Sequence, residues 1–141
     1  AGQELLAGFR LFWGAEPPAR SPLAHTVATR TGLGGIIGKK RNYFSWRFAV
    51  DFAGGELASL IDKGEVEAVV QASRGKLEIV SARPLREING YRAMFDLVPG
   101  DDSTAQIDIR LFLRSGGKTL TETWLYQYSP PPAGAPERTL Y

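Results

Sequence analysis

The feature that most constrains the fold of this chain is an alternation of apolar and polar side chains at every second position. In the stretch 44–52, Ser45, Arg47 and Asp51 are polar. The alternate positions hold Phe44, Trp46, Phe48, Val50 and Phe52. Because neighbouring side chains of a β-strand point to opposite faces, this period gathers the apolar groups on one face. The stretch is therefore predicted to be a half-buried strand.

Seven further stretches show the same period, and no stretch shows a sustained helical period. They are 9–13, 25–31, 66–72, 76–82, 91–98, 106–113 and 120–128. Turn-forming pairs separate them, among them Gly54-Gly55, Asn89-Gly90 and Gly116-Gly117. One helical turn is expected at 56–61. Short strands joined by tight turns predict an all-β fold, an immunoglobulin-like antiparallel β-sandwich of seven to eight strands.

The length of 141 residues suits a single domain, which at this size buries roughly two-thirds of the surface of the unfolded chain. We expect the sandwich to occupy residues 1–128. The remaining residues, 129–141, include Pro130, Pro131, Pro132 and Pro136. Proline has no backbone N–H and cannot pair in the middle of a sheet, so this Pro-rich C-terminal tail is expected to be mobile or extended.

Composition excludes several classes of protein. The 17 basic and 15 acidic residues leave a net charge of +2, which is too small to bind nucleic acid through a basic field. The chain has no cysteine, which excludes disulfides, thiolate metal sites and cysteine nucleophiles. No apolar stretch approaches the ~20 residues of a membrane-spanning helix, so no membrane span is predicted. Strand-like sequence begins soon after Ala1, and we expect any export signal to have preceded it.

The closing hairpin, 113–128, carries the most specific residues of the chain. It reads Leu-Arg-Ser-Gly-Gly-Lys-Thr-Leu-Thr-Glu-Thr-Trp-Leu-Tyr-Gln-Tyr. It resembles the end of the periplasmic glucan biosynthesis proteins G and D, the MdoG/OpgD family, which close with an arginine-bearing strand, a glycine turn and Glu-Thr-Trp-x-Tyr-Gln. The matching residues are Glu122, Thr123, Trp124, Tyr126 and Gln127. The likeness continues upstream, in the family's order, through 9–14, 27–30, 48–52, 66–70 and 95–97.

This resemblance covers nearly the whole chain, from about residue 9 to residue 128, but nothing here resembles the much larger N-terminal domain of such proteins. It implies the early-set variety of the immunoglobulin-like fold and a periplasmic location. It also implies a non-catalytic C-terminal domain that serves the synthesis of osmoregulated periplasmic glucans with a β-1,2-linked backbone. Proteins like these include glycoside hydrolases with the active site in the N-terminal domain, so this domain alone is not expected to be an enzyme. The implied partners are the absent N-terminal domain and β-glucan.

The titratable side chains select no active site. A glycosidase needs an acid and a base that face each other across a bound sugar. The candidate carboxylates are Asp51, Asp96, Asp108 and Glu122. Nothing singles out two of them, and ion pairs with Arg47, Arg92 or Arg110 are the favoured role. His25 is the only histidine and cannot supply a catalytic triad or a metal cluster by itself. No catalytic, cofactor or metal site is predicted.

The glycine-rich stretch 32–40 invites comparison with a phosphate-binding loop. A Walker-type loop in this register needs glycine at position 33 and serine or threonine at position 40. The chain has Leu33 and Lys40 there. We therefore expect a flexible loop between two strands, with a solvated basic end at 39–41.

The aromatic side chains allow two interpretations. Exposed rings can stack on sugars, and Trp13 and Tyr91 are the candidates for carbohydrate binding. Buried rings form a core, which is the favoured role of Trp46 and Trp124 because both alternate in phase with apolar neighbours. Two alternatives to the implied family function therefore stay open, a stand-alone carbohydrate-binding module and a protein–protein adaptor domain.

Several strands carry apolar residues on both faces. Examples are Phe12 beside Trp13, Val69 beside Val70, Phe112 beside Leu111 and Leu125 beside Trp124. A free-standing sandwich needs one apolar face for each sheet, so part of the second face is expected to cover another domain or subunit.

Glu122 lies two residues before Trp124 and is expected to share its face. A carboxylate at that position needs a partner, because burying an unpaired charge is costly. We expect it to pair with Arg10, Arg30 or Arg110, to be hydrogen-bonded at the sandwich edge, or to turn towards the absent domain.

Overall fold

The computed structural model describes residues 23–36, 38–40, 43–63 and 65–138. Its strands are β1 (His25–Leu33), β2 (Trp46–Ala53), β3 (Glu67–Ala72), β4 (Lys76–Leu85), β5 (Gly90–Val98), β6 (Ile107–Ser115), β7 (Lys118–Thr119) and β8 (Trp124–Tyr128). Its helices are α1 (Leu57–Leu60) and the 3-10 turns η1 (Arg86–Ile88) and η2 (Pro136–Arg138). Among the described residues, no helix is both long and apolar enough to cross a membrane. The predicted strand 9–13 lies outside the described residues.

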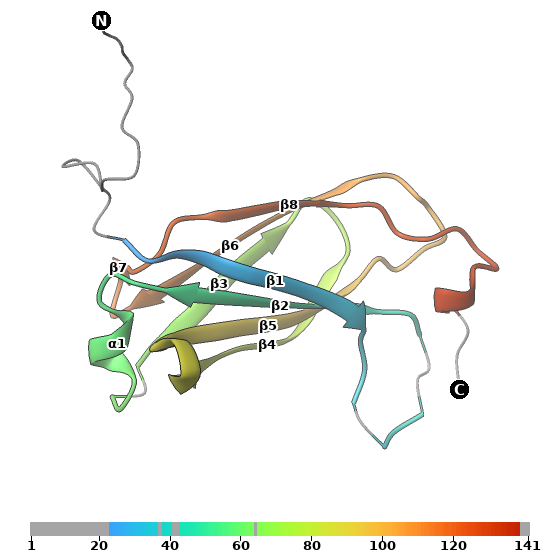
Figure 1. Ribbon diagram of the computed structural model, residues 1–141. Coiled ribbons are helices and arrows are strands. Elements are labelled where there is room, and N and C mark those ends of the chain that lie inside the picture. Colours follow the sequence, from blue (N-terminus) through green and yellow to red (C-terminus); the bar gives the residue numbers. More distant parts are fainter. Residues whose placement is uncertain (1–22, 37, 41–42, 64, 139–141) are drawn as a thin grey trace, which may run out of the picture.

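The strands form two antiparallel sheets that pack against each other (Figure 1). The first sheet has the order β1-β2-β5-β4. The second sheet has the order β3-β6-β7, with β8 also paired to β6. This arrangement confirms the predicted all-β antiparallel sandwich, and α1 confirms the expected helical turn.

The core lies between the two sheets and is built from the alternating apolar positions. Phe48 of β2 lies opposite Phe95 of β5, and their rings stack with centroids 5.1 Å apart. From the second sheet, Trp124 meets both rings edge-on, at 6.1 Å and 6.2 Å. These side chains are at most 7% exposed, so the predicted core position of Trp124 is confirmed. Trp46, the other expected core tryptophan, is partly buried and stacks on Tyr128.

The closing strand differs from the prediction, because β8 begins at Trp124 rather than at residue 120. Residues 120–123 lie opposite only the two residues 112–113 of β6. Extra residues on one strand force the chain to bulge out of the ladder. Here the Thr121 hydroxyl accepts the Leu113 N–H at 3.1 Å, in place of the backbone carbonyl of a regular strand.

The same bulge joins the two sheets. Ala24, just before β1, donates its N–H to the Leu120 carbonyl at 3.0 Å and accepts the Glu122 N–H at 2.8 Å. Ala24 and Thr121 thus form a buried parallel bridge. The bulge also breaks the alternation, so Glu122 is exposed and does not share the inward face of Trp124. The expected position of Glu122 is therefore wrong, and among the described residues its carboxylate has no ion pair.

The Pro-rich tail turns back onto the sandwich. The turn η2 carries Arg138, whose guanidinium lies 4.7 Å from the centre of the Phe44 ring. Arg138 Nε also donates to the Pro131 carbonyl at 2.8 Å. The described part of the tail is therefore packed against the domain, while the domain boundary at residue 128 stays a prediction.

Candidate functional site

Two carboxylates on the outer face of the first sheet are almost completely buried. Asp51 of β2 and Asp96 of β5 alternate with core residues, so their side chains point away from the core. Such outward positions are normally in water, yet these side chains are 6% and 1% exposed. A buried charge is tolerated where ion pairs and hydrogen bonds replace its water, and each aspartate has such partners.

Asp51 is held by two arginines from neighbouring strands. Arg92 of β5, directly opposite in the register, donates from Nε to Oδ1 at 2.7 Å and from Nη2 to Oδ2 at 3.1 Å. Arg30 of β1 donates from Nη1 to Oδ2 at 3.1 Å. The hydrogen bond from Arg92 is the main reason that the pKa of Asp51 is lowered, while burial opposes the shift.

This network predicts a contribution to stability that is lost in acid. Because the pKa of Asp51 is lowered from its usual 3.8, the unfolded chain takes up a proton at a higher pH than the folded chain does. The stabilisation is therefore complete above about pH 5 and declines as the pH falls through 3.8 towards the lowered value. Urea unfolding of the 141-residue chain at neutral and at acidic pH measures the difference.

The control is the Asp51→Asn variant, in which this group no longer titrates. It should lose less stability between neutral and acidic pH than the unsubstituted chain does. An equal loss in the two proteins would show that Asp51 does not carry the pH dependence.

Asp96 connects the first sheet to the loop between β1 and β2. Arg47 of β2 donates from Nε to Oδ1 at 2.7 Å and from Nη2 to Oδ2 at 3.1 Å. The Gly35 N–H donates to Oδ2 at 2.9 Å, and the Gly35 carbonyl accepts Nη2 of Arg47 at 2.6 Å. A Cβ at Gly34 would lie 2.3 Å from Ser45 Oγ, so this close approach requires glycine. The loop that was expected to be a flexible connection is thus anchored in its first half.

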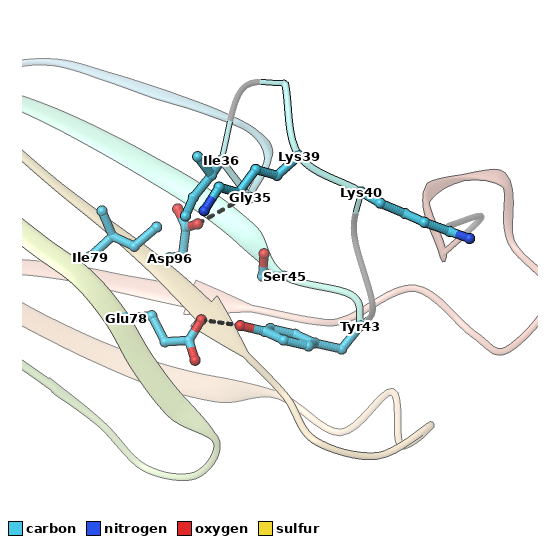
Figure 2. A pocket seen from close by; sticks show the side chains of 9 residues that line it. All are labelled: Gly35, Ile36, Lys39, Lys40, Tyr43, Ser45, Glu78, Ile79 and Asp96. Atoms are coloured by element: carbon cyan, nitrogen blue, oxygen red, sulfur yellow. Dashed lines mark hydrogen bonds between the residues drawn. The ribbon is translucent and has the colours of Figure 1, made fainter. Parts of the chain in front are cut away.

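The anchored loop covers a pocket of about 250 Å³ at one end of the first sheet. Figure 2 shows its lining, which is Gly35, Ile36, Lys39, Lys40, Tyr43, Ser45, Glu78, Ile79 and Asp96. Lys39 extends back towards Gly35, whereas Lys40 points away from the pocket. The Tyr43 hydroxyl donates to Glu78 Oε1 at 2.7 Å, and this hydrogen bond raises the pKa of Tyr43. The pocket thus combines an ammonium group, a carboxylate and an aromatic ring.

A bulge in β4 shapes the apolar side of this pocket. The register against β5 shifts between Glu78 and Ser81. Within the shift Ile79 has a φ of 55°, a left-handed conformation that is rare for a β-branched residue. Such strain costs on the order of 1–3 kcal/mol and clusters at binding and active sites. Ile79 and Val80 are 47% and 43% exposed, so the bulge presents apolar surface beside the pocket.

The groups in the pocket favour binding over catalysis. Nucleophilic catalysis needs an activated hydroxyl or thiol next to a base, but Ser45 is 3% exposed and no histidine lines the pocket. The Tyr43 hydroxyl adjoins Glu78, but this contact raises the pKa of Tyr43 and so disfavours the phenolate. Asp96 is already engaged by Arg47 and Gly35. In the part of the chain that the structure describes, no three His, Cys, Asp or Glu side chains gather as a metal site.

Of the two residues proposed for carbohydrate binding, the structure describes only Tyr91. Tyr91 is 1% exposed in the core, and its hydroxyl donates to the Leu60 carbonyl at 2.8 Å. It offers no free face to a sugar, so its assignment is corrected to a core role. Trp13 lies outside the described residues. Tyr43, which is 50% exposed at the pocket, was not predicted, because no periodicity between the strands indicates where its side chain points.

The four candidate carboxylates do not meet across a cleft. Asp51 and Asp96 are paired with arginines, as predicted. Asp108 lies on the outer face of the second sheet, and Glu122 lies at the closing bulge. No acid and base therefore face each other among these four side chains.

These features define a class of protein, a small antiparallel β-sandwich domain with structural carboxylates and a pocket at one end. The family described as "Periplasmic glucan biosynthesis protein, MdoG" matches residues 1–128, and the chain belongs to this family.

The chain is also similar to much longer bacterial proteins. It is 86% identical over 140 residues to the Glucans biosynthesis protein D of Stenotrophomonas maltophilia. It is 73% identical over 142 residues to the Glucans biosynthesis protein D of Xanthomonas campestris pv. campestris. Each match covers 99% of this chain and 26% of the relative, at its C-terminal end. The chain therefore spans about a quarter of the length of these relatives.

Proposed function

We propose that this chain is the non-catalytic C-terminal domain of a periplasmic protein that serves the synthesis of osmoregulated periplasmic glucans. In this proposal it packs against the larger N-terminal domain, which holds the groups that act on the β-1,2-linked glucan. Support comes from the 86% identity to a protein named Glucans biosynthesis protein D, together with the family description as periplasmic.

The main support for a non-catalytic role is the pKa and the hydrogen bonding of the buried carboxylates. A glycosidase acid needs a raised pKa, so that it can give a proton to the leaving oxygen. Arg92 and Arg30 lower the pKa of Asp51, which is the opposite direction. Both oxygens of Asp96 accept hydrogen bonds from Arg47, and Gly35 adds another. The carboxylate oxygens of both aspartates are therefore already engaged, and neither is free to bind a sugar.

The alternative of a stand-alone carbohydrate-binding module has narrower support. Binding modules present exposed rings to the sugar face, and Tyr43 is the exposed aromatic side chain among the described residues. The adaptor alternative agrees with the apolar surface beside the pocket, at Ile36, Ile79 and Val80. Neither feature explains why the relatives are named for glucan biosynthesis.

The test is a reducing-sugar assay with the purified 141-residue chain and linear β-1,2-glucan. We expect no reducing ends above the blank, whereas a β-1,2-glucan hydrolase in parallel shows that the substrate is cleavable. The proposal fails if the chain turns over glucan and the activity disappears in Asp51→Asn or Asp96→Asn. Asp108→Asn is the matched control, since its carboxylate is exposed on the other sheet.

A further inference from the structure

The two outer faces of the sandwich differ in character. On the first sheet the buried aspartates and their arginines satisfy one another, as described for Asp51 and Asp96. The outward positions of the second sheet are Glu67, Val69, Gln71, Asp108, Arg110, Phe112, Arg114, Leu125 and Gln127. We call these nine residues the second-sheet face. It contains three apolar side chains that have no part in the core.

Leu125 is the most exposed apolar group of this face. At 69% it has the largest exposed fraction among the large hydrophobic side chains that the structure describes. Its cross-strand neighbour is Arg110, while Val69 and Phe112 pair on the adjoining strands. A shallow hollow beside Leu125 is lined in part by Asp108, Arg110 and Gln127. The face thus offers an apolar centre with a basic and an acidic side chain beside it.

The charges on this face leave one cation available. Arg114 Nε donates to Glu67 Oε1 at 2.7 Å, so these two neutralise each other. Arg110 has no ion pair among the described residues and is exposed. A fitting partner surface therefore presents apolar side chains against Leu125 and a carboxylate against Arg110.

The point at which the described chain begins lies closer to one apolar surface than to the other. Ala24 is bonded to Leu120 and Glu122, directly before β8. Leu125 follows Thr121 by four residues, about 13 Å of extended chain. The other apolar patch, at Ile79 and Val80, lies beyond the nine residues of β1, about 30 Å from the entry point. The described part of the chain therefore begins closest to the second-sheet face.

The size of the face fits contact between two domains of one chain. Three strands about 4.8 Å apart, with six residues each as in β3, cover roughly 300 Å². Interfaces between domains of one chain bury about 600–1,500 Å² in total, counted over both surfaces. The area of this face therefore matches one of the two surfaces of an interface at the lower end of that range. A covalent tether raises the effective concentration of the partner and makes a small interface sufficient.

We infer that the second-sheet face is the docking surface for the N-terminal domain that the longer relatives carry. Leu125, Phe112 and Val69 form the apolar centre of the interface, and Arg110 pairs with an acidic residue of that domain. This inference rests on the proposed function, because it requires that domain to be present.

Cysteine labelling of the full-length protein tests it. Leu125→Cys is compared with Val80→Cys, which is exposed on the far corner, and the unsubstituted protein gives the background. We expect the cysteine at position 125 to react about tenfold more slowly with a maleimide in the native protein than in urea, because it reacts only while the interface is open. The cysteine at position 80 should react at similar rates in both conditions. Gln127→Cys repeats the test in case Leu125→Cys misfolds.

Two results would overturn the inference. One is native labelling at 125 and 127 as fast as in urea, since it places the face in solvent. The other is protection that disappears when the protein is diluted, since a second copy rather than the tethered domain then covers the face. Neither result depends on glucan turnover. A failed labelling test would therefore overturn the docking inference without changing the outcome of the reducing-sugar assay, which tests the proposed function.

Discussion

Replacing Trp124 with alanine is expected to leave the 141-residue chain unfolded or nearly so. The indole is 7% exposed and packs on Phe48, Phe95 and Tyr126 with centroids 5.1–6.2 Å apart. Its Nε1 also donates to Thr29 Oγ1 at 3.0 Å, which links β8 to β1. Removing such a ring costs about 3–5 kcal/mol. The free energy of unfolding of a domain is about 5–15 kcal/mol, so this loss removes a large share of it.

The adjacent residue supplies the control. Leu125 points to the opposite face and is 69% exposed, so Leu125→Ala should change the free energy of unfolding by no more than about 0.5 kcal/mol in this chain. Urea unfolding followed by circular dichroism compares the two variants. An unchanged midpoint for Trp124→Ala would place the ring in solvent and contradict the packing described here.

Replacing Asp96 with alanine should be the second most damaging change. It leaves the guanidinium of Arg47, 25% exposed, without its carboxylate and removes the acceptor of the Gly35 N–H. Breaking a buried ion pair from one side costs about 3–5 kcal/mol. We expect about 2–4 kcal/mol, because water can reach part of Arg47. The first half of the glycine-rich loop should lose its anchor as well.

Asp62→Ala is the matched control for this prediction. Its ion pair with Arg86 has the same chemistry, but the two side chains are 83% and 67% exposed. Exposed pairs of this kind contribute about 0–1 kcal/mol. Urea unfolding measures both variants, and hydrogen exchange at the Gly35 amide reports on the loop. Equal stabilities for the two variants would refute a structural role for Asp96.

The strands were predictable because alternation is a local property of the sequence. Seven of the eight predicted strands fall on strands of the structure, and the eighth, 9–13, lies outside the described residues. The closing strand was predicted too long because the chain bulges at residues 120–123, where a side-chain hydroxyl takes the place of a backbone carbonyl as hydrogen-bond acceptor. Thr121 accepts the Leu113 N–H, and periodicity does not reveal such a substitution.

The pocket could not be predicted for a different reason. Its anchor joins Gly35 to Asp96, which are 61 positions apart, and no local pattern indicates that contact. The glycine-rich stretch correctly indicated a loop between two strands, and Leu33 and Lys40 had already excluded a phosphate loop, but the sequence did not reveal that the loop is anchored. Tyr91 was misassigned because aromatic residues suit both a core and a sugar-binding surface, and exposure distinguishes them only once the sheet order is known.

The bridge between Ala24 and Thr121 has a consequence for synthesis of the protein on the ribosome. The first strand cannot complete its contacts until the last one has been synthesised, because the Trp124 indole donates a hydrogen bond to Thr29 across 95 positions of sequence. Contacts between such distant positions slow folding, because a long loop must close before any of them forms. The nascent domain therefore keeps an exposed apolar face until its final strand has left the exit tunnel. A chain that stalls before residue 120 lacks Thr121 and Trp124, the partners of Ala24 and Thr29, and is a substrate for chaperones or proteases.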